Sequence, residues 1–86
     1  MHVYSLENCP HCDALKAHLY ARGAEFVECD LNDAAARTDV IVGIGYVPLE
    51  APVLYAAGKF YDSSVLFPGH YLNQELVDKV VNDDMC

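Results

Sequence analysis

The stretch His2-Val3-Tyr4-Ser5-Leu6-Glu7-Asn8-Cys9-Pro10-His11-Cys12 joins an apolar, alternating strand pattern directly to a pair of cysteines. Two cysteines separated by two residues, placed between a strand and a helix, are typical of a thiol–disulfide redox site. Cys9 would lie at the first turn of the helix, where unpaired backbone N–H groups and the helix dipole favour a thiolate. Pro10 would occupy the first helical position, where a missing N–H costs nothing. Cys12 follows one turn later, close enough to form a disulfide with Cys9.

The cysteine pair has two other interpretations. It could be half of a zinc site, completed by Cys29, Cys86 or histidines, but structural zinc sites in short chains usually contain a second closely spaced ligand pair, and this sequence has none. It could be a purely structural disulfide, but a bridge that closes so short a loop restricts the unfolded chain little. The sequence therefore favours redox chemistry by Cys9 and Cys12 and predicts no metal site.

The length and composition indicate one domain, residues 1–86, with a real but modest core. Five basic against 13 acidic side chains give a net charge of -8, which argues against a nucleic-acid partner. No apolar run approaches the ~18 residues of a membrane span, and the N-terminus does not have the pattern of a secretory signal. We therefore expect a cytoplasmic protein, most simply a monomer, with no nucleic-acid or membrane partner.

Helix and strand patterns alternate along the chain. Apolar spacing predicts a helix from residue 10 to about residue 22, ended by Gly23, and then a strand over 25–31 that runs parallel to the first. A second helix is predicted over 34–41, capped by Asn32 or Asp33 and frayed at 43–45. A strand over 53–55, a turn at 57–59 and a strand over 60–62 form an antiparallel hairpin. A loop or short helical turn begins at residue 63 and is broken at Pro68-Gly69, and a last helix follows Asn73.

Three side chains outside the cysteine pair could also carry chemistry. Cys29 falls within the second predicted strand, and we expect it to be a small buried residue because free cysteine is among the most buried types. Cys86 ends the chain, where a thiol is prone to intermolecular disulfides. His18 is expected to pack on a helix face, since no second metal-type side chain lies one turn away.

This order of elements resembles the glutaredoxin family over essentially the whole chain. Two motifs carry the resemblance, namely Cys9-Pro10-His11-Cys12 with Lys16 one turn later, and Ala51-Pro52 directly before the third strand. The resemblance implies an α/β thioredoxin fold, with a four-stranded mixed sheet and three helices. It also implies that Pro52 is cis and lies against the redox pair, and that Ala51 offers main-chain groups to an incoming disulfide.

The same resemblance implies a dithiol oxidoreductase that reduces protein disulfides or glutathione mixed disulfides. Cys9 would attack as a thiolate, and Cys12 would resolve the resulting mixed disulfide. Pro10 would pre-set the helix start, while His11 would stabilise the thiolate and make the potential less reducing than that of a thioredoxin. No tightly bound cofactor is implied. Glutathione would be the co-substrate, and the electrons would come either from glutathione itself or from the enzyme thioredoxin reductase.

Departures from the family pattern cluster where glutathione would bind. Leu6 stands where many glutaredoxins have a lysine, Glu50-Ala51-Pro52 replaces Thr-Val-Pro, and Asp62-Ser63-Ser64 replaces Gly-Gly followed by an acidic residue. The carboxylates of Glu50 and Asp62 would weaken the binding of glutathione, an anionic tripeptide, and would raise the pKa of the Cys9 thiol. Ser63 and Ser64 could still offer hydroxyl and N–H groups at a helix start.

These departures favour one alternative, a glutathione-independent redoxin that is reduced by thioredoxin reductase and donates electrons to ribonucleotide reductase. An iron–sulfur cluster carrier is another, in which Cys9 thiolates from two protomers and two glutathiones hold the cluster. Proline after the first cysteine often hinders cluster assembly in the family, so this alternative ranks lower. A zinc-binding structural module is a third.

Overall fold

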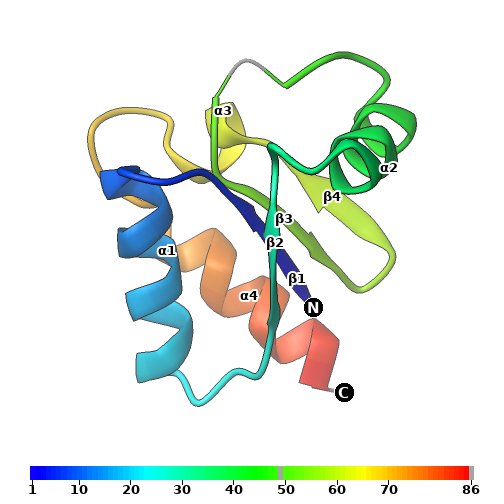
Figure 1. The fold of residues 1–86 in the computed structure, drawn as a ribbon. Helices are drawn as coiled ribbons and strands as arrows, with labels where there is room; N and C mark the ends of the chain where they lie inside the picture. The colour runs from blue at the N-terminus through cyan, green and yellow to red at the C-terminus, as the bar shows by residue number, and fades with distance from the viewer. Residues whose placement is uncertain (49, 86) are drawn as a thin grey trace.

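Four strands form one mixed sheet at the centre of the molecule (Figure 1). The computed structural model describes residues 1–48 and 50–85. In the order β2-β1-β3-β4, β1 pairs with β2 in parallel and with β3 in antiparallel orientation, and β3 pairs antiparallel with β4. The strands are β1 (His2–Ser5), β2 (Val27–Asp30), β3 (Val53–Ala56) and β4 (Lys59–Tyr61). The predicted four-stranded mixed sheet is confirmed.

Helices cover both faces of the sheet: α1 and α4 lie on one side and α2 on the other (Figure 1). The helices are α1 (Pro10–Ala21), α2 (Ala34–Ile44), α3 (Ser63–Leu66) and α4 (Gln74–Met85). The predicted count of three helices is one too few, because the loop or short helical turn expected from residue 63 is the four-residue helix α3. No helix in the described part of the chain is long and apolar enough to span a bilayer.

Local capping explains where the helices begin and end. Asp33 caps α2, because its carboxylate accepts a hydrogen bond from the backbone N–H of Ala36 at 3.2 Å. α2 continues to Ile44 and ends at Gly45, whose φ of 85° is left-handed, so the fraying expected from residue 43 does not occur. Asp62 caps α3 in the same way, with its carboxylate 3.1 Å from the N–H of Val65.

The apolar side chains form two clusters, one on each face of the sheet, because alternate residues of a strand point to opposite faces. In β1, Val3 belongs to the cluster under α1 and α4, whereas Tyr4 belongs to the cluster on the α2 side. The first cluster contains Val3, Leu15, Leu19, Leu54, Val77 and Val80, among others. The second contains Tyr4, Cys12, Leu31, Val40, Ala51 and Val53. The second cluster therefore contacts the redox motif directly, through Cys12 and Ala51.

Three polar side chains link α1 to α4. His18 Nε2 lies 2.7 Å from Asp78 Oδ1, and the guanidinium of Arg22 donates to Asp78 Oδ2 at 2.8 Å. His18 thus packs on the helix face, as expected, and its partner is a carboxylate from the terminal helix. The hydrogen bond from His18, followed by the charge of Arg22, lowers the pKa of Asp78 below its usual value.

Replacing Asp78 with asparagine should lower the free energy of unfolding near neutral pH. The lowered pKa of Asp78 means that its carboxylate stabilises the fold above the usual aspartate pKa of about 4. This contribution is lost as the pH falls through the still lower pKa of the folded protein. We expect the difference between wild type and variant to shrink in denaturant unfolding series taken from about pH 7 down to about pH 2. Asp83→Asn removes the same charge from α4 outside this link, and an equal acid dependence in that control would contradict the assignment.

Candidate redox site

Cys9 and Cys12 are joined by a disulfide at the start of α1, with their Cα atoms 5.2 Å apart. Asn8 adopts a left-handed conformation with φ of 54°, which asparagine tolerates, and so turns the chain from β1 into the helix. Cys9 is the N-cap residue, and its Sγ accepts a hydrogen bond from the backbone N–H of Cys12 at 3.1 Å. Pro10 occupies the first turn of the helix.

The two sulfurs differ in exposure. Cys12 is completely buried, whereas Cys9 is only half-buried. A sulfur from outside the protein can therefore reach Cys9 but not Cys12, whose own reaction partner is Cys9 Sγ. The N–H of Cys12 and the dipole of α1 would also stabilise negative charge on Cys9 Sγ after reduction.

The Ala51-Pro52 peptide bond is cis, as the resemblance implies, and Pro52 is fully buried before β3. The carbonyl oxygen of Ala51 lies 3.8 Å from Cys9 Sγ. It also accepts a hydrogen bond from the buried hydroxyl group of Ser63 at 3.5 Å. The backbone carbonyl of Ala51 thus lies beside the half-buried Cys9 Sγ, and the hydrogen bond from Ser63 connects this carbonyl to α3.

His11 lies flat against Phe67, with ring centroids 4.1 Å apart and an angle of 7° between the ring planes. Phe67 directly follows α3 and is buried, so it fixes where the half-buried imidazole lies. This supporting residue is one that sequence reasoning missed. Its only signal is an aromatic residue before the Pro68-Gly69 break, which says nothing about a partner more than fifty residues away.

The hollow over the cysteine pair is acidic. A cavity of about 370 Å³ is lined by Cys9, Pro10 and Ala51 together with Glu7 and Glu50. None of the described residues that line it is a lysine or an arginine. Lys16, one turn after Cys12 in α1, does not line this hollow. Its ammonium group donates a hydrogen bond to Glu28 Oε1 at 2.8 Å, and this hydrogen bond raises the pKa of Lys16.

Asp62, Ser63 and Ser64 line a neighbouring cavity of about 250 Å³, with Glu50 common to both cavities. The Asp62 carboxylate accepts hydrogen bonds from the Val65 N–H, from the Ser64 hydroxyl at 2.7 Å and from the Tyr46 hydroxyl. The serine hydroxyls expected to meet glutathione therefore donate to groups within the protein, Ser63 to Ala51 and Ser64 to Asp62. Tyr46, whose exposed ring carries one of these donors, is a second residue that the sequence pattern did not reveal.

The other cysteines lie apart from this site or outside the described residues. The expectation that Cys29 is buried is wrong: it is half-buried and lines a different hollow, beneath α2. Burial, followed by the charges of Asp39 and Asp33, raises the pKa of its thiol. Cys86 lies outside the described residues. In residues 1–48 and 50–85, no group of three or more His, Cys, Asp or Glu side chains is arranged to hold a metal ion.

Comparisons with known proteins agree with this geometry. A family model described as Glutaredoxin matches residues 2–61. A mutant of the thioredoxin-like protein BC3987 is similar in structure, with a TM-score of 0.72 and 23% sequence identity over 94% of this chain and 97% of that chain. The glutaredoxin-like protein NrdH-redoxin from Escherichia coli, described as having a thioredoxin-like activity profile, has a TM-score of 0.65 and 16% identity over 92% of this chain and 91% of its own. No curated protein sequence matches this chain.

Proposed function

The chain belongs to the glutaredoxin family, and on that premise we propose that it reduces disulfides of proteins, or their mixed disulfides with glutathione, through Cys9 and Cys12. The observation that supports this most directly is the Cys9–Cys12 disulfide, with one sulfur half-exposed at a helix start and the other buried behind it. A structural bridge would need no such difference between its two sulfurs.

The reaction proceeds by two thiol–disulfide exchanges. In the reduced protein, the Cys9 thiolate attacks one sulfur of the substrate disulfide and releases the other as the first thiol. Cys12, after losing its proton, then attacks Cys9 Sγ, which forms the Cys9–Cys12 disulfide and releases the second thiol. Two electrons pass from the protein to the substrate, so an external thiol or a reductase must return two electrons before the next cycle.

The neighbouring residues take the roles that their positions allow. Pro10 and the Cys12 N–H stabilise the helix start and the Cys9 thiolate, respectively. His11, held against Phe67, places its ring beside the motif and tunes the thiolate. Ala51 and Pro52 orient an extended substrate, because the Ala51 backbone lies next to Cys9 Sγ.

Glutathione is the family's usual electron donor, and Asp62, Ser63 and Ser64 are its proposed contacts here. A second candidate, a thioredoxin reductase, is favoured by the charge around Cys9. Glutathione carries a net negative charge near neutral pH, and Glu7 and Glu50 line the hollow that it must enter. Like charges at an encounter surface slow association. The thioredoxin-like activity profile described for NrdH-redoxin points the same way for a protein of similar fold.

Parallel coupled assays would test both candidates. The purified protein is given a glutathione mixed disulfide as substrate and is coupled either to glutathione with glutathione reductase or to thioredoxin reductase, with NADPH consumption as the readout. Turnover in the first assay supports glutathione as donor, and turnover only in the second supports the redoxin alternative. Turnover in neither assay contradicts the proposed oxidoreductase activity.

A charge variant tests whether Glu50 slows the reaction with glutathione. If Glu50 repels glutathione, Glu50→Gln should raise the rate with glutathione about two- to fivefold, with a smaller gain at high salt. Asp83→Asn removes one carboxylate charge from the C-terminal part of α4, which lies at the far end of the molecule from the start of α1 (Figure 1), and should leave the rate unchanged. Equal rates for all three proteins would show that Glu50 does not select the donor.

A further inference from the structure

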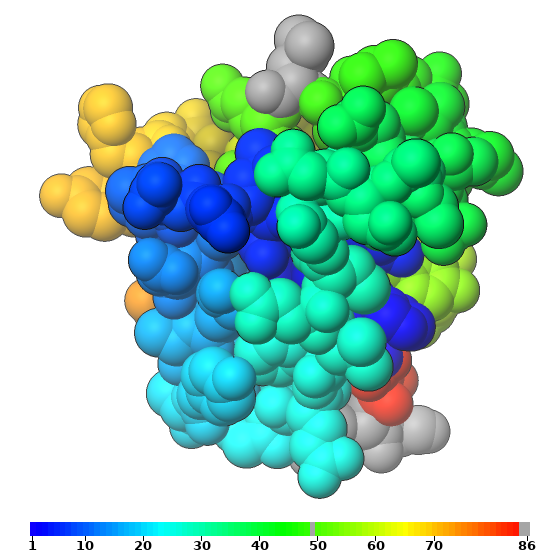
Figure 2. All heavy atoms as spheres, viewed as in Figure 1, coloured from blue at the N-terminus to red at the C-terminus, as the bar shows by residue number. Residues whose placement is uncertain are grey.

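The α2 face of the sheet contains a hollow that the redox site does not use. α2 packs over β4, where Gly43 leaves room for the Phe60 ring that any larger side chain would displace. The rest of this face stays open, and Figure 2 shows part of β1, in dark blue, recessed behind β2 and α2. The open space is a cavity of about 670 Å³, within the usual range for small-molecule sites. The residues that matter here are His2, Tyr4, Cys29, Asp39, Tyr55 and Phe60.

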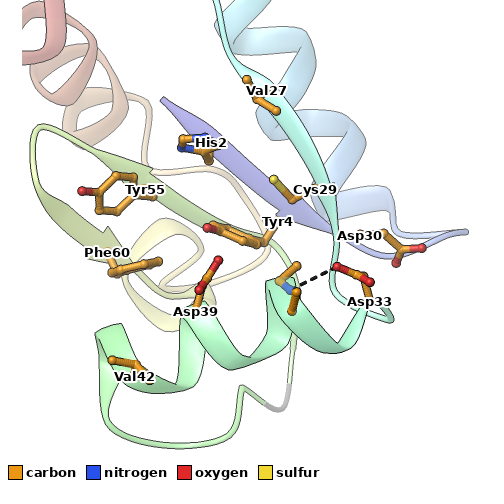
Figure 3. A pocket seen from close by; sticks show the side chains of 12 residues that line it. His2, Tyr4, Val27, Cys29, Asp30, Asp33, Asp39, Val42, Tyr55 and Phe60 are labelled. Atoms are coloured by element: carbon orange, nitrogen blue, oxygen red, sulfur yellow. Dashed lines mark hydrogen bonds between the residues drawn. The ribbon is translucent and has the colours of Figure 1, made fainter.

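Aromatic rings form the floor of the hollow (Figure 3). The strand register places His2 opposite Tyr55, with ring centroids 5.8 Å apart. Tyr55 lies 4.6 Å from Phe60, and Phe60 lies 6.1 Å from Tyr4, so the four rings are continuous across three strands. The half-buried rings of His2, Tyr55 and Phe60 can contact a flat apolar ligand, whereas the Tyr4 ring is buried beneath them; the faces of tyrosine and phenylalanine rings also attract cations.

Three carboxylate side chains also line the hollow. Asp39 extends from α2 toward Tyr4 and Phe60 in Figure 3, and Asp30 and Asp33 also line the hollow. Asp33 is engaged in capping α2. Among the described residues, the salt bridges involve Lys16, His18 and Arg22, none of which lines the hollow, so Asp39 has no cationic partner.

Two residues that line the hollow have raised pKa values. Burial raises the pKa of Tyr4, and the nearby Cys29 and Asp39 raise it further. Burial, and then Asp39 and Asp33, raise the pKa of the Cys29 thiol. Burial is the larger cause for both groups and the charge of Asp39 adds to it, so a further negative charge in the hollow is disfavoured.

We propose that this hollow binds a small organic cation with an aromatic or apolar body. The flat body lies on the half-buried rings, and the ammonium or guanidinium group lies beside the Asp39 carboxylate, within reach of the Phe60 ring. Anionic ligands are excluded by the carboxylates. The site lies apart from the Cys9–Cys12 pair, so this proposal does not depend on the proposed redox function.

Three probes with the same ring and different charge test the proposal on the oxidised protein. Benzylammonium, benzyl alcohol and benzoate are titrated separately, and binding is followed by NMR shifts of Tyr4, Cys29, Tyr55 and Phe60. We expect the cation to bind about threefold to tenfold more tightly than the alcohol, and benzoate to bind most weakly. Benzylammonium should also slow alkylation of Cys29 by the uncharged reagent iodoacetamide. Equal affinities, or shifts centred on other residues, would overturn the proposal.

Charge variants locate the contact. Asp39 is exposed, so Asp39→Asn is not expected to disturb folding, and it should weaken benzylammonium binding about threefold while leaving benzyl alcohol unchanged. Glu75→Gln removes one charge far from the hollow and should leave both affinities unchanged. If the two variants weaken binding equally, general electrostatic attraction by an acidic protein explains the result, and the assigned site is wrong.

Discussion

Replacing Cys9 with serine is expected to abolish disulfide reduction, with a fall in rate of at least about a thousandfold. A serine hydroxyl does not form a disulfide and is not ionised near neutral pH, so no mixed disulfide can begin the cycle. The readout is the initial rate in whichever coupled assay supports turnover of the wild-type protein. Cys29→Ser is the matched control, because it makes the same change at a half-buried thiol outside the redox pair, and its rate should equal that of the wild type.

Cys12→Ser separates the two cysteines. Cys12 is buried, so its variant should still attack through Cys9 and then remain as a mixed disulfide. Mass spectrometry should find this adduct with a protein substrate, attached to the peptide that contains Cys9. An adduct on Cys12 in the Cys9→Ser protein, or residual turnover of Cys9→Ser within about tenfold of wild type, would reverse or refute the assigned roles.

Leu54→Ala should lower the free energy of unfolding by about 3 kcal/mol, because Leu54 is fully buried and the truncation leaves a cavity in the larger cluster. Small domains are stable by only about 5–15 kcal/mol, so this single change would remove a large share of the total. Leu54 lies in β3 opposite Val3 of β1 and Tyr61 of β4, where three strands share its packing.

Guanidinium unfolding of the oxidised protein measures this effect. Leu6→Ala makes the same truncation at a side chain that is 38% exposed, and it should cost less than about 1 kcal/mol. A similar loss in the two variants would contradict the assignment of a large stabilising contribution to the burial of Leu54.

Most of the fold could be predicted because its signals are local. The helix after Pro10 and the strands around Val3 and Val53 follow from apolar spacing within a few residues of each position, and the cysteine pair indicates the junction between strand and helix. α3 was expected only as a loop or short helical turn, because four residues cannot display a helical period and the start of α3 depends on the hydrogen bond that Asp62 accepts from the Val65 N–H.

In the candidate site, the Cys9–Cys12 disulfide and the cis Ala51-Pro52 bond could be predicted, but their surroundings could not. Cys9, Cys12 and the Ala51-Pro52 bond are recognised by motif, but the stack of His11 on Phe67 joins segments far apart in the chain. The exposure of Cys29 likewise depends on how α2 crosses the sheet, and no local pattern encodes that path.

The sheet order also bears on aggregation. β2 and β4 are the two edge strands, and their outer backbone groups could pair with another chain. Both are short, and each carries charge: β2 has Glu28 and Asp30, and β4 begins at Lys59. Pairing β2 with the β2 of a second molecule would bring the Glu28 and Asp30 carboxylates of the two chains close together. The acidic side chains of β2 therefore disfavour the addition of a strand from a second molecule at this edge of the sheet.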